Sequence, residues 1–243
     1  MIADLFHTVV YVPLYNALIA LYSFGGWVDM GIAVIILTIL VRLLLAPLSL
    51  KASRAQRVMR AVEPELKKIR EEYKDDKETQ GRKMLELYKE KKINPFSGIL
   101  TLFIQLPVIL GLYFVFLKGG LPEVNSDLLY SFVHAPIAAV QTTFLGTVDM
   151  LGQSIFLAIL AGVTQHIYAR YSFPKPKETT GERTFQEDFA RSMRVQVLFV
   201  LPFMIVIFGY ITSAAVALYW VTSNVCSIVQ EWYVKHTFEK ETA

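Results

Sequence analysis

The chain contains 243 residues, of which 54% are hydrophobic, and it carries a formal net charge of +3. Its charged residues gather in a few blocks that separate apolar runs of about 20 residues, a length that spans a bilayer and that no soluble domain requires repeatedly. One cysteine and four scattered histidines supply no disulfide and no Cys/His metal site. The chain also has no glycine-rich phosphate loop and no G-x-S-x-G motif, so we expect no metal, no cofactor and no enzymatic activity.

Residues 6–24 form the first apolar run. Tyr11 and Tyr15 recur at helical spacing, while Leu14 and Leu18 lie on the opposite side of the same helix. This pattern is typical of a helix that lies in the membrane interface, with its tyrosines at the level of the headgroups. A sixth transmembrane span is the alternative, because the run is long enough for one.

Arg42 lies near the middle of the next apolar run, Gly31–Leu50. A guanidinium at the centre of a bilayer costs between about 2.5 and 17 kcal/mol, depending on how far water and headgroups follow it. One explanation is an arginine that extends to a headgroup or pairs with a carboxylate. We favour a water-filled cavity inside the membrane, into which Arg42 points.

Residues 51–93 are too charged to lie in lipid, because the stretch up to Lys92 holds 14 Lys/Arg and 9 Asp/Glu. Two apolar stripes at three- and four-residue spacing nevertheless predict two helices. Residues 74–77 (KDDK) interrupt the pattern, so we expect the helices to fold back as an antiparallel hairpin in the cytoplasm. Pro64 would lie inside the first of these helices and should kink it.

Four more spans are expected after the hairpin: Pro95–Leu117, Leu151–Tyr171, Val195–Gly209 and Ala214–Tyr233. The third of these would give only about 22 Å of helix against a hydrocarbon core of about 30 Å, so it must thin the bilayer or take length from its flanks. The sequence therefore predicts an all-α fold. Residues 1–243 would form a single polytopic membrane domain with five transmembrane helices, the interfacial helix and the cytoplasmic hairpin.

Lysine and arginine set the expected orientation through the positive-inside rule. Residues 1–30 and 119–150 contain neither, whereas the hairpin and residues 170–194 are basic. We therefore expect the N-terminus and residues 119–150 outside, and the hairpin, residues 170–194 and the C-terminus in the cytoplasm.

Polar side chains recur at helical spacing in every span except Val195–Gly209. Those expected on the same interior as Arg42 are Thr38, Gln105, Gln165, Tyr168, Trp220, Ser223 and Asn224. Taken singly, uncharged polar groups of this kind are ordinary helix-packing contacts, worth about 0.6 kcal/mol each. Together with an arginine they fit a hydrated groove, which would lower the cost of bringing polar peptide segments into the membrane.

Three motifs in a fixed order resemble a known family. They are ILTILVRLLLAPLSLK (Ile36–Lys51), KINPFSGILTLFIQLPVILGLY (Lys92–Tyr113) and ALYWVTSN (Ala217–Asn224). In sequence and order these segments are similar to the YidC/Oxa1/Alb3 membrane protein insertases, and the resemblance extends from about Ile32 to Lys235.

The resemblance implies an insertase of the bacterial plasma membrane that moves short hydrophilic segments of new membrane proteins across the bilayer without ATP. It assigns Arg42 to a groove that is open to lipid and cytoplasm, Thr38 to the polar position one turn earlier, and Trp220 to an aromatic that contacts substrate. Tyr168 stands where many members have glutamine, and Gln165 lies one turn before it. The implied partners are nascent membrane proteins and the lipid bilayer, with the ribosome and the Sec translocon as further partners; no direct nucleic-acid specificity is implied.

A small anion transporter or channel, in which Arg42 supplies the binding charge, is the alternative function. Transporters usually contain two related halves with interrupted spans, and no such repeat is visible in the sequence.

Overall fold

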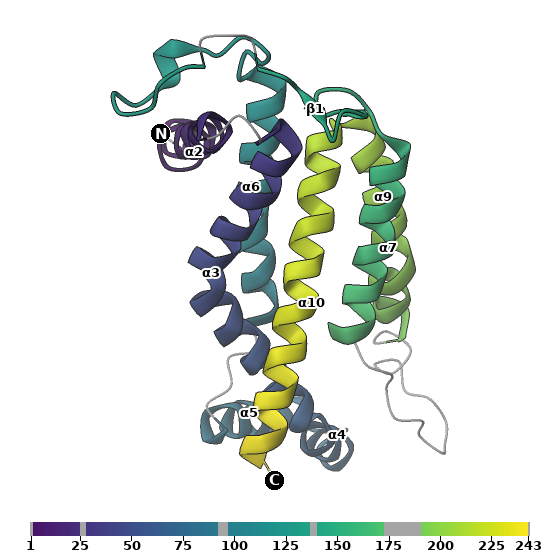
Figure 1. The fold of residues 1–243 in the computed structure, drawn as a ribbon. Coiled ribbons are helices and arrows are strands. Elements are labelled where there is room, and N and C mark those ends of the chain that lie inside the picture. Colours follow the sequence, from purple (N-terminus) through teal and green to yellow (C-terminus); the bar gives the residue numbers. More distant parts are fainter. Residues whose placement is uncertain (1, 25–27, 92–96, 137–139, 173–190, 243) are drawn as a thin grey trace. The chain divides into compact units, whose positions relative to one another are not determined.

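The structure is a computed structural model that describes residues 2–24, 28–91, 97–136, 140–172 and 191–242 (Figure 1). The chain divides into two compact units. The first contains Met1–Leu44 and Pro107–Trp232, and the second contains Leu45–Leu106 and Tyr233–Ala243.

The described chain is almost entirely helical, as the apolar periodicity predicts. The helices of the first unit are α1 (Ile2–Phe6), η1 (His7–Tyr11), α2 (Val12–Ser23), η2 (Ser126–Leu128), α7 (Ile155–Ser172), η3 (Gln196–Val200) and α9 (Leu201–Ile211). The second unit contains α4 (Glu63–Glu72) and α5 (Lys77–Glu90), and three long helices contribute to both units: α3 (Met30–Ala61), α6 (Ser97–Lys118) and α10 (Ala214–Thr242). The only strands among the described residues are β1 (Thr143–Phe144) and β2 (Val148–Asp149), which form a two-residue antiparallel pair.

Three helices of the described chain are long and apolar enough to cross a membrane: Ala3–Ser23, Met30–Met59 and Arg191–Ile211. The last of these corrects the expectation of a short span at Val195–Gly209. It has 21 residues, or about 31 Å at 1.5 Å per residue, and so matches a hydrocarbon core of about 30 Å. The helix takes this length from its flanks, so the bilayer need not become thinner beside it. The count of five spans stays a prediction, and residues 95 and 96, where the second span should begin, lie outside the described residues.

The N-terminal helix lies across the other helices of the first unit. Figure 1 shows α2 along its axis, whereas α7 and α9 are seen from the side. The tyrosine side and the leucine side of α2 are both buried in the protein, because Tyr15 and Leu18 are each 0% exposed. Both sides of the helix contribute to one apolar core, in which they meet residues of α3, α6 and α10 such as Val34, Val115 and Tyr219.

Polar groups of α2 hold the segment that follows α6. The hydroxyl of Tyr15 accepts a hydrogen bond from the backbone N–H of Asn125 at 2.8 Å. The amide of Asn16 donates to the carbonyl of Leu128 at 2.8 Å and accepts from the N–H of Tyr130 at 2.7 Å. Because these bonds satisfy backbone groups outside regular structure, they fix this segment against α2.

Asp29 ties the start of α3 to the turn between the two strands. One carboxylate oxygen accepts from the N–H of Ile32 at 2.8 Å and so satisfies an orphan donor in the first turn of the helix. The other oxygen accepts from the N–H of Leu145 at 2.9 Å. Leu145 and Gly146, the first two of the three residues that connect the strands, both have positive φ, which is common in tight strand connections.

A π-helical turn precedes a proline at two places in the first unit. The π-helix η1 ends two residues before Pro13, and η3 ends two residues before Pro202. Proline has no backbone N–H, so the carbonyl four residues earlier loses its α-helical donor. The backbone widens locally at these positions, which is a common response to such a loss.

In the second unit, α4 and α5 pack on each other through an apolar cluster. Its buried members are Val62, Leu66 and Leu87. An ion pair between Lys91 and Glu65, at 3.6 Å, also joins the two helices. On the surface, such a pair contributes about 0.2–1 kcal/mol, so the apolar cluster dominates the contact.

The prediction that Pro64 kinks the interior of a helix is wrong. The long helix α3 ends at Ala61, and α4 begins at Glu63, which places Pro64 in the first turn of α4. The missing N–H of proline costs little there, because the first N–H groups of a helix have no partner within the helix.

Candidate functional site

Arg42 connects α3 to α10 within the first unit. Its Nε donates to the hydroxyl oxygen of Ser223 at 3.0 Å, and its Nη2 donates to the same oxygen. Ser223 is 1% exposed, whereas Arg42 is half-buried. Within the described part of the chain, Arg42 forms no ion pair with a carboxylate. A guanidinium has five N–H donors, so one hydroxyl leaves about three of them to be solvated by water or headgroups.

Two further hydroxyls on α3 and α10, those of Thr38 and Ser227, are satisfied inside their own helices. Thr38, one turn before Arg42, is buried and donates to the carbonyl of Val34 at 2.6 Å. Ser227 donates to the carbonyl of Ser223 at 2.9 Å. These local bonds remove the cost of burying the two hydroxyls. Neither bond uses the hydroxyl oxygen of Ser223, which is the atom that accepts from Arg42.

Asn224 connects α10 to α7. Its Nδ2 donates to the hydroxyl of Thr164 at 3.2 Å and to the carbonyl of Ala161 at 3.3 Å. Gln165, the neighbour of Thr164, is also buried. Thr164 is a member of this polar contact that the sequence did not single out, although its position beside Gln165 in the same span was a usable signal.

Three other expected site residues, Trp220, Tyr168 and Gln105, are half-buried. Trp220 is half-buried, and its ring meets Phe208 of α9 edge-to-face, with the centroids 5.9 Å apart. Tyr168 is half-buried on α7. Gln105 is half-buried and belongs to the second unit. Among the expected site residues, hydrogen bonds therefore join Arg42 to Ser223 directly, and Asn224 joins α10 to α7.

Glu231 is a buried acidic residue that the sequence reasoning missed. It is 4% exposed on α10, eight residues after Ser223, which corresponds to about 12 Å along the helix. Its signal was visible in the sequence, because it is the one carboxylate in the apolar run Ala214–Tyr233. A buried carboxylate in such a helix is costly unless it is paired.

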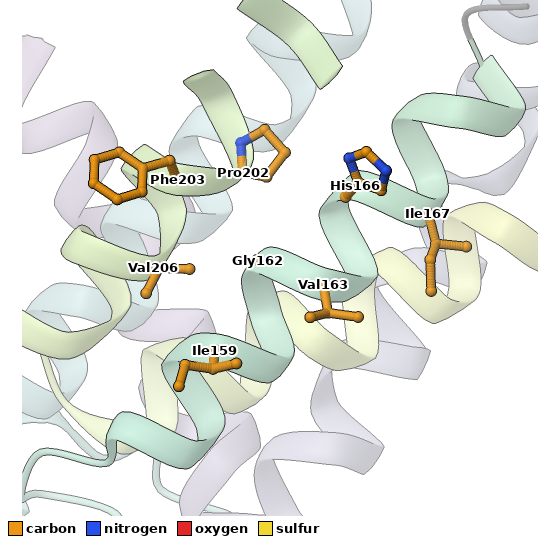
Figure 2. Close-up of a pocket in the computed structure, with 8 residues that line it drawn as sticks. All are labelled: Ile159, Gly162, Val163, His166, Ile167, Pro202, Phe203 and Val206. Carbon is orange, nitrogen blue, oxygen red and sulfur yellow. The ribbon is translucent and has the colours of Figure 1, made fainter. Parts of the chain in front are cut away.

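A hollow of 260 Å³ lies between α7 and α9 (Figure 2). Its lining residues are Ile159, Gly162, Val163, His166, Ile167, Pro202, Phe203 and Val206. Every lining side chain except the imidazole of His166 is apolar. The hollow is therefore a separate feature from the polar contact at Arg42.

The chain matches the family model of the 60Kd inner membrane protein over residues 20–241. It belongs to this family, the YidC/Oxa1 family. Two similar YidC/Oxa1 relatives carry the name membrane protein insertase YidC, one from Francisella philomiragia subsp. philomiragia and one from Francisella tularensis subsp. novicida. Each is 32% identical over 218 residues, which cover 88% of this chain and 33% of the relative.

The chain therefore spans about a third of the length of these curated relatives. The match confirms the family resemblance that the three sequence motifs carry, and it does not favour the anion transporter or channel. Together, the YidC/Oxa1 family and the apolar helices indicate a multi-pass protein of the bacterial membrane.

Proposed function

We propose that this chain is a membrane protein insertase that helps newly made membrane proteins enter the bilayer without ATP hydrolysis. The observation that carries the proposal is Arg42, which lies in an apolar helix and has one serine hydroxyl as its partner among the residues that the structure describes. Its remaining N–H groups require water or headgroups, and a hydrated groove supplies both. The names of the two Francisella relatives agree with this activity.

The proposed mechanism is electrostatic and solvating. Water around Arg42 lowers the cost of placing polar peptide groups inside the membrane, and the positive charge attracts acidic residues of the translocated segment. The groove would be lined by the remaining predicted residues, which are Thr38, Gln105, Gln165, Tyr168, Trp220, Ser223 and Asn224. No step requires a covalent intermediate, a metal or a nucleotide.

The proposed topology has five spans, with the N-terminus outside and the C-terminus inside. Two segments without Lys or Arg, residues 1–30 and 119–150, are hydrogen-bonded to each other through Tyr15 and Asn16. Segments without positive charge are the ones expected outside. The transverse direction of α2 supports an interfacial position for it, although its length and apolar character also suit a span.

The proposed substrates are nascent membrane proteins, which would arrive from the cytoplasm. The two packed helices α4 and α5 would form the cytoplasmic hairpin that receives them. The ribosome and the Sec translocon are proposed as further partners.

Reconstitution into proteoliposomes tests this function. A single-span substrate with an acidic translocated segment is synthesised in their presence, and its insertion is measured by protection from protease. We expect Arg42→Ala to reduce insertion on the order of tenfold, equivalent to about 1.4 kcal/mol. Arg42→Lys should retain most of the insertion, because the positive charge matters more than the planar geometry of the guanidinium group.

Lys118→Ala is the matched control, because it removes one positive charge at the end of α6. Equal insertion by the wild type and by Arg42→Ala would overturn the proposed role of Arg42. Ion conductance by the wild type in a planar bilayer, without insertion activity, would favour a channel instead.

A further inference from the structure

The hollow between α7 and α9 opens away from the core of the first unit. Its lining residues Ile159, Val163 and Phe203 are large and apolar, yet Val163 is 50% exposed and Phe203 is 64% exposed. On the other side of α7, Ala161 and Gln165 are buried. In a membrane the open side of this hollow faces hydrocarbon chains.

The floor of the hollow is a close helix contact. A Cβ added to Gly162 would overlap the side chain of Val206 and would lie 3.0 Å from the carbonyl oxygen of Pro202. Glycine therefore lets the two helices approach here, and the larger side chains above it form the walls (Figure 2). The hollow is therefore a consequence of the local packing of α7 on α9.

The shape and lining of the hollow suit a hydrocarbon chain. It offers 260 Å³ between apolar side chains of α7 and α9. Its lining extends over nine residues of α7, from Ile159 to Ile167, whose ends lie about 12 Å apart along the helix axis. An extended acyl chain can lie along such a space.

Positive charge lies at one end of the hollow. His166 is beside Leu198, and the two helices run in opposite directions. Arg170 follows His166 by one turn, and Arg194 precedes Leu198 by one turn, so both arginines reach the same end. Arg170 is exposed. A phosphate at this level would meet two guanidinium groups, which bind phosphate through paired N–H donors.

We propose that one anionic phospholipid binds this chain, with an acyl chain along the hollow between α7 and α9 and its phosphate at Arg170 and Arg194. The apolar lining supplies contact area, and the arginines supply the preference for an anionic headgroup. This site is distinct from the proposed groove at Arg42 and does not depend on insertase activity.

Native mass spectrometry of the purified chain tests the proposal. The probes are phosphatidylglycerol and phosphatidylcholine with identical oleoyl chains, added at equal concentration. We expect the wild type to retain phosphatidylglycerol several-fold more than phosphatidylcholine. Val163→Trp, which fills the hollow, should lose retention of both lipids, whereas Arg170→Gln should lose only the preference.

Two control variants match these changes elsewhere on the first unit. Val225→Trp adds an indole at an exposed position of α10, and Lys118→Gln removes one charge from the end of α6. Both should retain lipid as the wild type does. If Val163→Trp does not fold, as judged by its thermal midpoint in detergent, Arg170→Gln still tests the headgroup contact at an exposed position.

Three results would overturn the proposal. They are equal retention of the two lipids by the wild type, an unchanged preference in Arg170→Gln, and undiminished phosphatidylglycerol on a folded Val163→Trp. Binding of an apolar model helix in place of phosphatidylglycerol would assign the hollow to a peptide.

Discussion

The Nδ1 atom of His166 lies 2.6 Å from the carbonyl oxygen of Leu198. Because a carbonyl oxygen only accepts, Nδ1 must carry the donated proton. Leu198 is four residues before Pro202, so an α-helix would leave this carbonyl without its usual donor. The imidazole of α7 thus supplies a hydrogen bond that the proline of α9 cannot.

We predict that His166→Leu destabilises the chain by about 1–3 kcal/mol, the cost of leaving a buried backbone group unpaired. In a Pro202→Ala background the same change should cost less, because an alanine in place of the proline regains an N–H that can reach the carbonyl of Leu198. Unfolding free energies of the four proteins in mixed detergent and SDS micelles give the coupling between the two positions.

His134→Leu is the control for that cycle, because His134 is exposed in the segment after α6. It should change stability by no more than about 0.5 kcal/mol. Equal costs of His166→Leu in the two backgrounds would show that the imidazole does not replace the donor that proline lacks.

The apolar periodicity of the sequence predicted where the helices lie, but it could not give all of their ends. The expected span Val195–Gly209 was too short because Arg191–Arg194 looked like loop residues, whereas the structure continues the helix through them. Pro64 was expected to kink a helix, and it begins one instead. In both cases the decisive interaction is local hydrogen bonding at a helix end, which hydrophobic spacing does not report.

The polar contacts show a similar limit. Helical spacing marked Arg42, Ser223 and Asn224 as residues of one interior, and the structure joins the first two directly. Spacing within one helix cannot say which residue of another helix is the partner, so Thr164 was missed. It also could not show that Tyr15 is buried in the protein, because the hydrogen bond from Asn125 that accompanies this burial comes from a segment 110 residues away.

We predict that Ser223→Ala destabilises the chain by about 1.5–3 kcal/mol, the usual range for a hydrogen bond to a charged group. The guanidinium of Arg42 would lose its acceptor on α10. Ser227→Ala should cost less, because Ser227 bonds only within its own helix turn. Unfolding in mixed micelles measures both. If the two substitutions lower the free energy of unfolding equally, the hydrogen bond from Arg42 to Ser223 adds no stability beyond that of a buried serine bonded within its own helix.

Asn16 should control the order of the segment that follows α6. We expect Asn16→Ala to speed hydrogen exchange at Tyr130, whose N–H loses its acceptor, and to raise protease cleavage between residues 121 and 136. Gln153→Ala, at an exposed position, is the control. Unchanged exchange at Tyr130 in the Asn16→Ala variant would mean that other contacts hold the segment.

Asp76 should make the start of α5 sensitive to acid. It caps this helix by accepting from the N–H of Thr79 at 3.0 Å, and its hydrogen bonds to Thr79 lower the pKa of its carboxyl. The stabilisation is therefore present above the ordinary aspartate pKa of about 3.9 and is lost as the pH falls through the lower folded value.

Asp76→Asn removes this titration and keeps a capping side chain. The measured quantity is the hydrogen-exchange rate of amides in the first turn of α5, given as the ratio of the wild type to Asp76→Asn. We expect this ratio to be higher at acidic pH than at neutral pH. A ratio that does not change with pH would show that the cap does not depend on the charge of Asp76.

The position of the N-terminus decides the proposed topology. Residues 1–30 carry no Lys or Arg that would hold them in the cytoplasm, so a cysteine at Ala3 should lie outside. We expect Ala3→Cys, in a Cys226→Ser background, to react with a membrane-impermeant maleimide in intact spheroplasts. Glu78→Cys in α5, on the proposed cytoplasmic side, should react only after lysis. The opposite result at Ala3, with labelling only in lysed cells, would mean that Ala3–Ser23 spans the membrane as a sixth helix and that the chain begins inside.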